Sequence, residues 1–250
     1  MRWFLKLSYR GAPFHGWQRQ PNAGSVQQSV EEALATVLRR ETPIVGAGRT
    51  DTGVNARTMF AHFDTKSPIE DRRRFLLSLN RLCGRDIAFH DVLPVRDDAH
   101  ARFDATARQY RYFVTEEKSP FLYPLSWQQT SLLDYAAMNR AAGLLLTTSD
   151  FTSFAKLHTD VKTNICRVTR ALWEEPFPGV HVFTIEADRF LRNMVRAVVG
   201  TLVDVGRGKL GTDGFQRIID TRDRCAAGTS MPPEALYLWD VTYPQEIFIP

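Results

Sequence analysis

The chain contains one compact polar segment whose residue types suit chemistry, Gly48-Arg49-Thr50-Asp51-Thr52-Gly53. It places the carboxylate of Asp51 between two glycines and two residues after Arg49. Glycines permit positive φ and a close approach of a ligand to the backbone. An arginine beside a carboxylate favours its ionised form. The segment is therefore typical of a loop that holds an ionised Asp51, although a surface turn with an incidental aspartate has the same pattern.

Several familiar kinds of site are excluded by the residues around Asp51. Gly46-Ala47-Gly48 begins like a dinucleotide-binding motif, but Asp51 stands where that motif needs its third glycine. The sequence has neither a phosphate-binding Gly-x4-Gly-Lys loop nor a Gly-x-Ser-x-Gly elbow. Its histidines never show the i, i+4 spacing of a helical metal site; they are His15, His62, His90, His100, His158 and His181. We expect no nucleotide cofactor and no metal.

Two further segments carry groups that can serve a carboxylate site. Arg196 follows Phe190-Leu191-Arg192-Asn193-Met194-Val195 at the start of an apolar helix. A cation beside a buried seam either pairs with a carboxylate or extends to solvent. Tyr110-Arg111-Tyr112-Phe113 predicts an aromatic strand, in which we expect one of the two tyrosines to be plain core. What remains is a site built from a carboxylate, an arginine and aromatic rings.

The elements that must position these residues alternate between strands and helices. The Ser25-x-x-Gln28 capping box begins a helix in which Val26, Val30 and Leu34 recur at helical spacing. Strands are expected at residues 3–9, 44–45, 59–63, 87–95, 110–115, 166–173, 180–187 and 236–243. Helices are expected at residues 25–40, 75–79, 133–146, 191–205 and 215–219.

This order of elements predicts an α+β fold. We expect two similar split β-α-β, ferredoxin-like domains with mostly antiparallel sheets packed side by side. The first covers residues 1–104 and carries the Asp51 loop; the second covers residues 105–250 and carries Tyr110 and Arg196. Because no low-complexity linker separates them, we expect the two domains to pack against each other.

Composition places the chain among ordinary globular proteins, with 44% hydrophobic and 24% charged residues. Three distant cysteines, Cys83, Cys166 and Cys225, favour a reduced, cytoplasmic setting. No apolar run approaches the ~18 residues of a membrane span, and the first residues do not resemble a signal peptide. The net charge of +4 rests on 26 arginines and six lysines. Arginine suits phosphate binding, but a GC-rich genome also produces many arginines, so the charge only permits a nucleic-acid partner.

Taken together, these segments resemble the TruA family of tRNA pseudouridine synthases. Residues 48–56 are similar to the family's Gly-Arg-Thr-Asp-x-Gly-Val-His-Ala signature. Residues 9–20 with Ser25-Val26-Gln27 resemble its N-terminal pattern, and residues 107–112 its tyrosine strand. Residues 190–196 and 236–243 are similar to its arginine helix and closing strand. The resemblance covers essentially the whole chain, and it departs from the family at Asn55, usually histidine, and at Ala235, usually glycine.

The resemblance implies isomerisation of uridine to pseudouridine at positions 38, 39 and 40 of the tRNA anticodon stem-loop. It makes Asp51 the nucleophile, attacking either the ribose C1′ or the uracil C6. Arg196 is then expected to pair with Asp51, and Tyr110 to stack on the target uracil. Arg49 is expected to occupy the space that the flipped base leaves. The resemblance also implies a homodimer that binds tRNA and needs no cofactor or metal.

Two alternatives remain open. A glycoside hydrolase would use a pair of carboxylates about 5–9.5 Å apart, for which Asp64 is the nearest partner of Asp51 in the sequence. A non-catalytic RNA-binding module would explain the arginines and aromatics. It gives no reason for a carboxylate in an RNA-facing loop, and the chain has no RNP1-type motif.

Overall fold

A computed structural model describes residues 1–156 and 162–249. It has mixed α+β architecture with a mostly antiparallel arrangement of strands, and the described residues form five α-helices. This confirms the predicted fold class at that level. The contacts divide the chain into two compact units, which are described separately. Unit 1 comprises Met1–Thr106 and the residues from Leu238 onward, and unit 2 comprises Ala107–Tyr237.

The sheet of unit 1 is built around its first strand. Its strands are β1 (Arg2–Tyr9), β2 (Val45–Gly46), β3 (Asn55–Asp64), β4 (Ile87–Val95) and the part of β9 (Leu236–Thr242) from Leu238. β1 pairs antiparallel with both β3 and β4, while β2 pairs antiparallel with β3. Strands β1 and β2, which α1 (Val26–Leu38) connects, are therefore separated in the sheet by β3.

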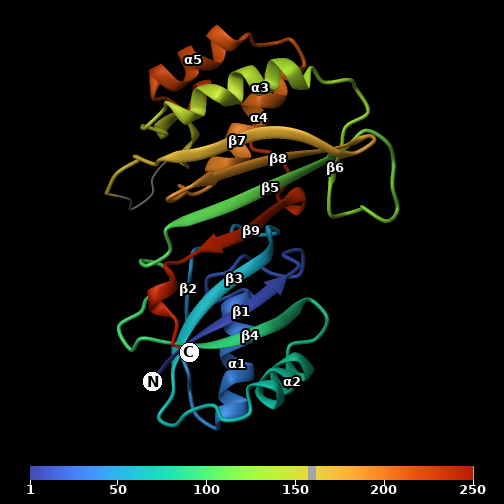
Figure 1. The fold of residues 1–250 in the computed structure, drawn as a ribbon. Helices are drawn as coiled ribbons and strands as arrows, with labels where there is room; N and C mark the ends of the chain where they lie inside the picture. The colour runs from blue at the N-terminus through green and yellow to red at the C-terminus, as the bar shows by residue number, and fades with distance from the viewer. Residues whose placement is uncertain (157–161, 250) are drawn as a thin grey trace. The chain divides into compact units, whose positions relative to one another are not determined.

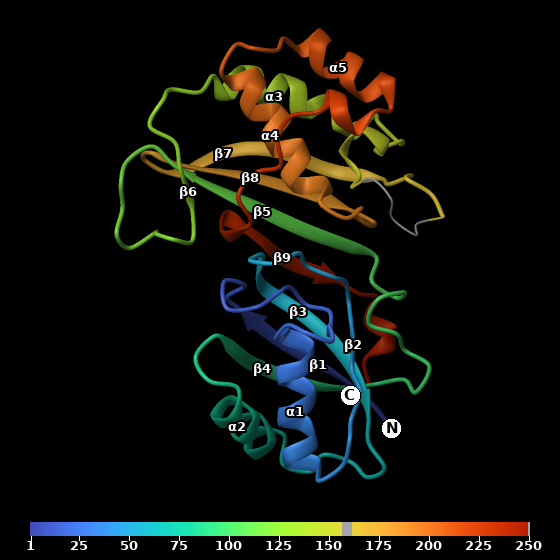
Figure 2. The ribbon, with the colours of Figure 1, turned by 180° about the vertical axis from the view of Figure 1, so that it is seen from behind.

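The two helices of unit 1, α1 and α2 (Arg72–Leu82), cover one face of this sheet. They lie behind the strands in Figure 1 and in front of them in Figure 2. Phe75 of α2 stacks on Phe63, which lies opposite Trp3 in the ladder between β3 and β1. Because side chains alternate along a strand, Leu5 and Leu7 share this helix-covered face and are fully buried. Lys6 and Ser8 point to the opposite face.

The start of α1 follows the prediction made from its capping residue. The Ser25 hydroxyl accepts the Gln28 backbone N–H at 3.2 Å, and Val26, Val30 and Leu34 are fully buried. The Gln28 side chain bonds Glu32 instead of reaching back to Ser25, so the capping box is only half formed. One satisfied N–H and one buried stripe suffice to begin the helix and to fix the face that it presents.

Unit 2 follows a similar plan. Its sheet has the order β5 (Ala107–Thr115), β8 (Val180–Ala187), β7 (Val168–Phe177), all antiparallel, and the short β6 (Trp127–Gln128) pairs parallel with the end of β5. Helices α3 (Tyr135–Gly143), α4 (Met194–Gly206) and α5 (Thr212–Thr221) lie on one side of these strands (Figure 1). The short 3₁₀ helices of unit 2 are Leu144–Leu146, Thr152–Phe154, Arg224–Ala226 and Pro233–Ala235, while Gln245–Ile247 belongs to unit 1.

Several boundaries differ from those expected. The helix predicted from residue 191 begins at Met194, because Asn193 adopts a left-handed conformation with φ 65° and donates its side chain to Ser230. The predicted helix 133–146 is α3 followed by a 3₁₀ turn. The expected division at residue 104 placed the closing strand in the second domain, whereas the contacts group Leu238 onward with unit 1. Ring contacts of Tyr243 with Phe4 and Phe60 contribute to this grouping.

Within the two described ranges, the chain forms no helix that combines the length and apolar character needed to cross a bilayer.

Candidate functional site

Asp51 lies in the loop between β2 and β3 of unit 1, as the sequence predicts. Its side chain is half-buried, while its backbone oxygen accepts the Val54 N–H at 3.1 Å and so closes the turn. Gly53 within this turn has φ +80°, a conformation that glycine adopts without strain. The backbone of the loop therefore fixes the position of the carboxylate in the turn.

A second segment, residues 9–17, forms hydrogen bonds with the Asp51 loop. The Tyr9 hydroxyl and the Thr50 hydroxyl form a buried hydrogen bond of 2.9 Å, and the Trp17 N–H donates to the Thr50 carbonyl at 3.2 Å. Gly16 has φ +88°, and a Cβ there would lie 2.5 Å from the Thr50 carbonyl oxygen. Only glycine permits this approach, so the backbone beside Asp51 is fixed by contacts from a segment more than thirty positions earlier.

Asn55 also helps to hold the segment 9–17 beside the Asp51 loop. It is 2% exposed, and its amide oxygen accepts the Gly11 N–H at 2.8 Å. This bond ties the end of β1 to the start of β3, just after the Asp51 loop. Asn55 replaces the histidine usual in the family that the chain resembles, and here its consequence is a local hydrogen bond. Ala235, the other departure, is buried in a 3₁₀ turn and has no positive φ.

Arg49, predicted to contact substrate, lies in the same loop as Asp51 with an exposed side chain. Among the described residues its guanidinium has no ion pair or hydrogen bond. An exposed cation two residues from a half-buried carboxylate can meet a phosphate without first breaking a contact.

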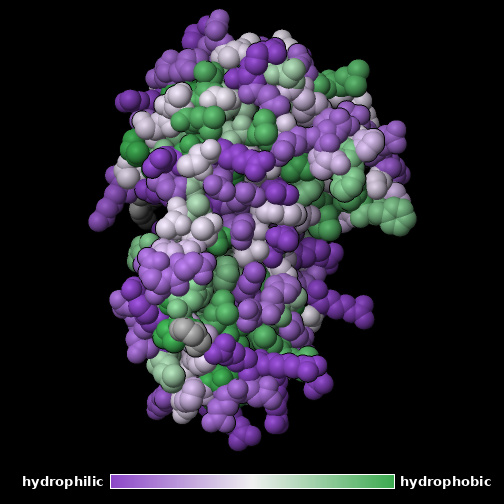
Figure 3. Space-filling view, viewed as in Figure 1, coloured by the Kyte–Doolittle hydropathy of each residue, from purple (hydrophilic) through white to green (hydrophobic). Residues whose placement is uncertain are grey.

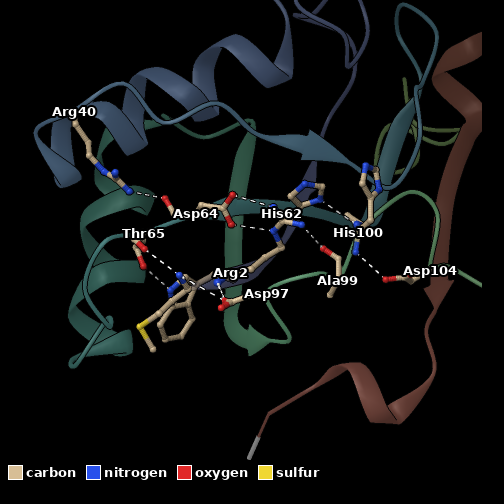
Figure 4. A network of polar contacts seen from close by, with 12 residues as sticks. Arg2, Arg40, His62, Asp64, Thr65, Asp97, Ala99, His100 and Asp104 are labelled. Atoms are coloured by element: carbon tan, nitrogen blue, oxygen red, sulfur yellow. Dashed lines mark hydrogen bonds and ion pairs between the residues drawn. The ribbon is translucent and has the colours of Figure 1, made fainter.

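Asp64, the carboxylate that a glycoside hydrolase would pair with Asp51, is the last residue of β3 and lies in a separate polar network (Figure 4). Arg2 donates two hydrogen bonds to the two carboxylate oxygens of Asp64, both 2.9 Å, and a third to the Ala99 carbonyl. The Arg2 hydrogen bond holds the pKa of Asp64 below its usual value. Ten residues of strand place this pair about 30 Å from the Asp51 loop, too far for the carboxylate pair of a glycoside hydrolase.

Tyr110 lies on β5 in unit 2, opposite Ile185 of β8. Its half-buried ring meets Phe190 edge-on, with the ring centroids 5.0 Å apart. Tyr112, two residues on and on the same face, is fully buried and donates its hydroxyl to the Pro232 carbonyl at 3.2 Å. Burial raises the pKa of Tyr112 far above its usual value. The expectation that one of the two tyrosines is plain core is confirmed, and it is Tyr112.

Arg196 is the third residue of α4, and its position is fixed by the segment that crosses this helix. Its Nε donates to the Met231 carbonyl at 2.5 Å, while the Met231 N–H donates to the Arg196 carbonyl. Gly200 permits this close crossing, because a Cβ there would lie 1.9 Å from the Thr229 carbonyl oxygen. Arg192, which the expected helix 191–205 would include, precedes the first residue of α4. Unit 2 thus brings Tyr110, Tyr112 and Arg196 to the helix-covered side of β5.

Metal-ligating side chains and buried thiols are the other reactive groups to consider in the described chain. No group of three or more metal-ligating side chains occurs among residues 1–156 and 162–249; His158 lies outside these ranges. Burial raises the pKa of the Cys83 thiol to about 11 and that of Cys166 to about 12, so both stay protonated at neutral pH.

Local sequence patterns do not reveal the residues that support the Asp51 loop. Tyr9, Gly16 and Trp17 belong to the N-terminal pattern of the sequence, which by itself gives them no role. The one local signal was the pair of glycines at positions 11 and 16 beside aromatic residues, which is typical of a tightly packed backbone. Their partner in the Asp51 loop is distant in sequence, so only the fold identifies it.

Comparison with known proteins gives a consistent family. The family model described as tRNA pseudouridine synthase matches residues 141–244. The chain is 56% identical to tRNA pseudouridine synthase A of Parabacteroides distasonis over 99% of this chain and 98% of that protein. It is 54% identical to the protein of the same name from Bacteroides fragilis, with the same coverage. The protein of that name from Pseudoalteromonas translucida is 38% identical over 100% of this chain and 95% of its own length. The chain therefore belongs to the tRNA pseudouridine synthase family.

Proposed function

We propose that this chain isomerises uridine to pseudouridine at positions 38, 39 and 40 of the tRNA anticodon stem-loop, with Asp51 as the nucleophile. As a member of its family, the chain is an isomerase that converts uridine to pseudouridine in tRNA. One observation carries the role of Asp51: its half-buried carboxylate stands on a loop anchored by Tyr9, Trp17 and the Val54 N–H.

The reaction requires that the uracil leave its N1–C1′ bond, turn, and rejoin the ribose through C5. Atoms balance within the nucleotide, since N1 gains a proton and C5 loses one. The Asp51 carboxylate attacks either C1′ or C6, for which it must be ionised. Arg196, fixed through Met231, is the cation that we assign to Asp51, and such a pair lowers the pKa of a carboxylate.

The remaining residues are assigned to the base and its surroundings. We assign Tyr110 to stacking on the target uracil, with its hydroxyl near C5. Such stacking contributes about 1–3 kcal/mol per base, and the Phe190 contact orients the ring. The target nucleotide must leave its stack to react, and the exposed Arg49 is suited to occupy the vacated space.

The strand order within the two units bears on the domain organisation that we propose. In unit 1 the later strand β3 separates β1 from β2, and in unit 2 the later strand β8 separates β5 from β7. This shared plan supports two similar split β-α-β domains, one carrying Asp51 and the other Tyr110 and Arg196. We further propose that the protein acts as a homodimer in the cytoplasm, where its tRNA substrate is found.

The experiment uses tRNA transcripts tritiated at uridine C5 that retain uridine at only one of positions 38, 39 and 40, with a transcript lacking all three as control. We expect tritium release from the first set and none from the control. Release from the control transcript at an equal rate would refute the assignment of position. Free uracil in solution would instead indicate a hydrolase.

A further inference from the structure

The face of the unit 1 sheet opposite α1 and α2 carries a cluster of cations and aromatic rings. Its members come from four strands: Lys6 of β1, Arg57 and Phe60 of β3, His90 of β4 and Trp239 of β9. Lys6 lies opposite Phe60 in the ladder, and His90 hydrogen-bonds Ser8 at 2.7 Å, which places both on this face. The face turns toward the viewer in Figure 1, and the lower half of Figure 3 shows hydrophilic and hydrophobic side chains interspersed there.

The two permanent cations of this cluster contact rings. The Lys6 ammonium lies 5.9 Å from the centre of the Phe60 ring, and the Arg57 guanidinium lies 4.7 Å from that of Trp239. Within the described part of the chain, neither cation makes an ion pair or a hydrogen bond. The Arg57 side chain is exposed, while those of Lys6 and Trp239 are half-exposed. Their donor hydrogens therefore remain available to an anion.

The charge around the cluster is net positive. Burial lowers the pKa of His90, and the Lys6 and Arg57 charges lower it further, so His90 is neutral at neutral pH. Asp91 lies opposite Lys6 in the ladder, and its carboxylate accepts the neighbouring Val92 N–H. Two cations thus face one carboxylate that is already engaged with the backbone.

The other end of the same face has a different character. There the rings of Tyr243 and Phe248 pack on Phe4, which is fully buried. The chain thus covers the apolar end of the face with its own C-terminal segment and leaves the cationic end open. Charge complementarity selects a polyanion as the occupant of that open end.

We propose that the cationic–aromatic face, defined by Lys6, Arg57, Phe60, His90 and Trp239, binds RNA outside the target nucleotide. Lys6 and Arg57 bind backbone phosphates, and the half-exposed Trp239 ring stacks on an unpaired base. Phosphate contacts by cations and base stacking on aromatics of an open sheet are the two recurring means of holding single-stranded RNA. This inference rests on the proposed function, because it adds a second contact region for the same tRNA substrate.

The test measures the affinity of the full chain for an unmodified tRNA transcript at several salt concentrations. The double variant Lys6→Gln/Arg57→Gln should bind at least fivefold more weakly at low salt. Its salt slope should fall by about 1.4–1.8, since each lost phosphate contact removes about 0.7–0.9. The matched control Arg73→Gln/Arg81→Gln removes the same charge from exposed positions on α2, and it should leave both quantities near those of the native chain. Trp239→Leu should weaken binding without changing the slope.

Three results would overturn the proposal. The first is native affinity and slope in the Lys6→Gln/Arg57→Gln variant, and the second is an equal loss in the α2 control. The third is a change of oligomeric state in sedimentation caused by the face variant alone, which would make the face a contact between copies of the chain. Tritium release from C5-labelled tRNA is a separate readout: if the native chain releases none while the face variant still binds weakly, the proposed function fails and the RNA face stands.

Discussion

Strand β3 has a carboxylate just before its first residue and another at its last, and their surroundings differ. Asp51 stands on a loop held by backbone contacts and a buried hydroxyl pair. Asp64 is held by the Arg2 guanidinium within a charged network (Figure 4). At the first position the contacts hold the backbone of the loop, whereas at the second position the carboxylate oxygens themselves accept two hydrogen bonds from Arg2.

We expect the largest effect from a substitution that disturbs the backbone contacts of the Asp51 loop. Gly16→Ala places a Cβ 2.5 Å from the Thr50 carbonyl at a residue with φ +88°. We expect a loss of about 2–4 kcal/mol in the free energy of unfolding, together with a fall in tritium release of more than tenfold. Chemical denaturation and the release assay measure the two quantities. Gly24→Ala is the matched control, because a Cβ there meets nothing within 4 Å; equal behaviour of the two variants would contradict the account.

Low pH should reduce the stability of the protein through His62, which lies near the Asp64 end of β3. His62 is buried beside Arg2 and His100, and its Nδ1 accepts the Ala101 N–H at 3.1 Å, so it folds in the neutral form. Burial lowers the pKa of His62 from 6.5 to about 4. The unfolded chain therefore binds the proton first, and stability falls as the pH drops from 6.5 toward 4. The expected loss is about 2–3 kcal/mol.

Denaturation at pH 6.5 and pH 4.5 checks this prediction. His62→Gln should flatten the dependence, while His15→Gln, at an exposed position, should retain it. An unchanged slope in His62→Gln would exclude His62 as its source.

A smaller loss is expected when the ion pair itself is removed. Arg2→Gln deletes the two bonds to Asp64 and the bond to Ala99. Since the Asp64 side chain is partly solvated, we expect a loss of about 1–2 kcal/mol in the free energy of unfolding. The initial rate of tritium release per folded molecule at pH 7.5 should stay within twofold of the native rate. A tenfold fall in that rate would mean that the two ends of β3 are coupled.

The smallest effect concerns Asn55. Asn55→Ala leaves the buried Gly11 N–H without its acceptor, at a cost of about 1–2 kcal/mol in unfolding free energy. We expect the rate of tritium release to fall only a few-fold, because the Tyr9 and Trp17 contacts to the loop remain. Asn22→Ala, at an exposed position, serves as the control. A stability equal to that of the native chain would show that the Asn55–Gly11 bond contributes nothing.

Local patterns in the sequence predicted much of this molecule. The Ser25 cap and the apolar spacing after it predicted α1, and the run of glycines with Asp51 predicted the loop. Local patterns could not predict the features that depend on contacts between residues far apart in the sequence. Asn55 and Gly11 are 44 residues apart, and the start of α4 depends on Asn193 bonding Ser230. The ion pair of Asp64 likewise depends on Arg2, which the pairing of β1 with β3 places beside it.

The most direct test compares the two carboxylates in one assay. Asp51→Asn, in the loop before β3, and Asp64→Asn, at the last residue of β3, remove the same charge. Each variant is incubated with tRNA tritiated at uridine C5. We expect no detectable tritium release by Asp51→Asn, with tRNA binding retained, and release within twofold of the native rate by Asp64→Asn. Release by Asp51→Asn at the native rate would contradict the account, as would equal loss in both variants.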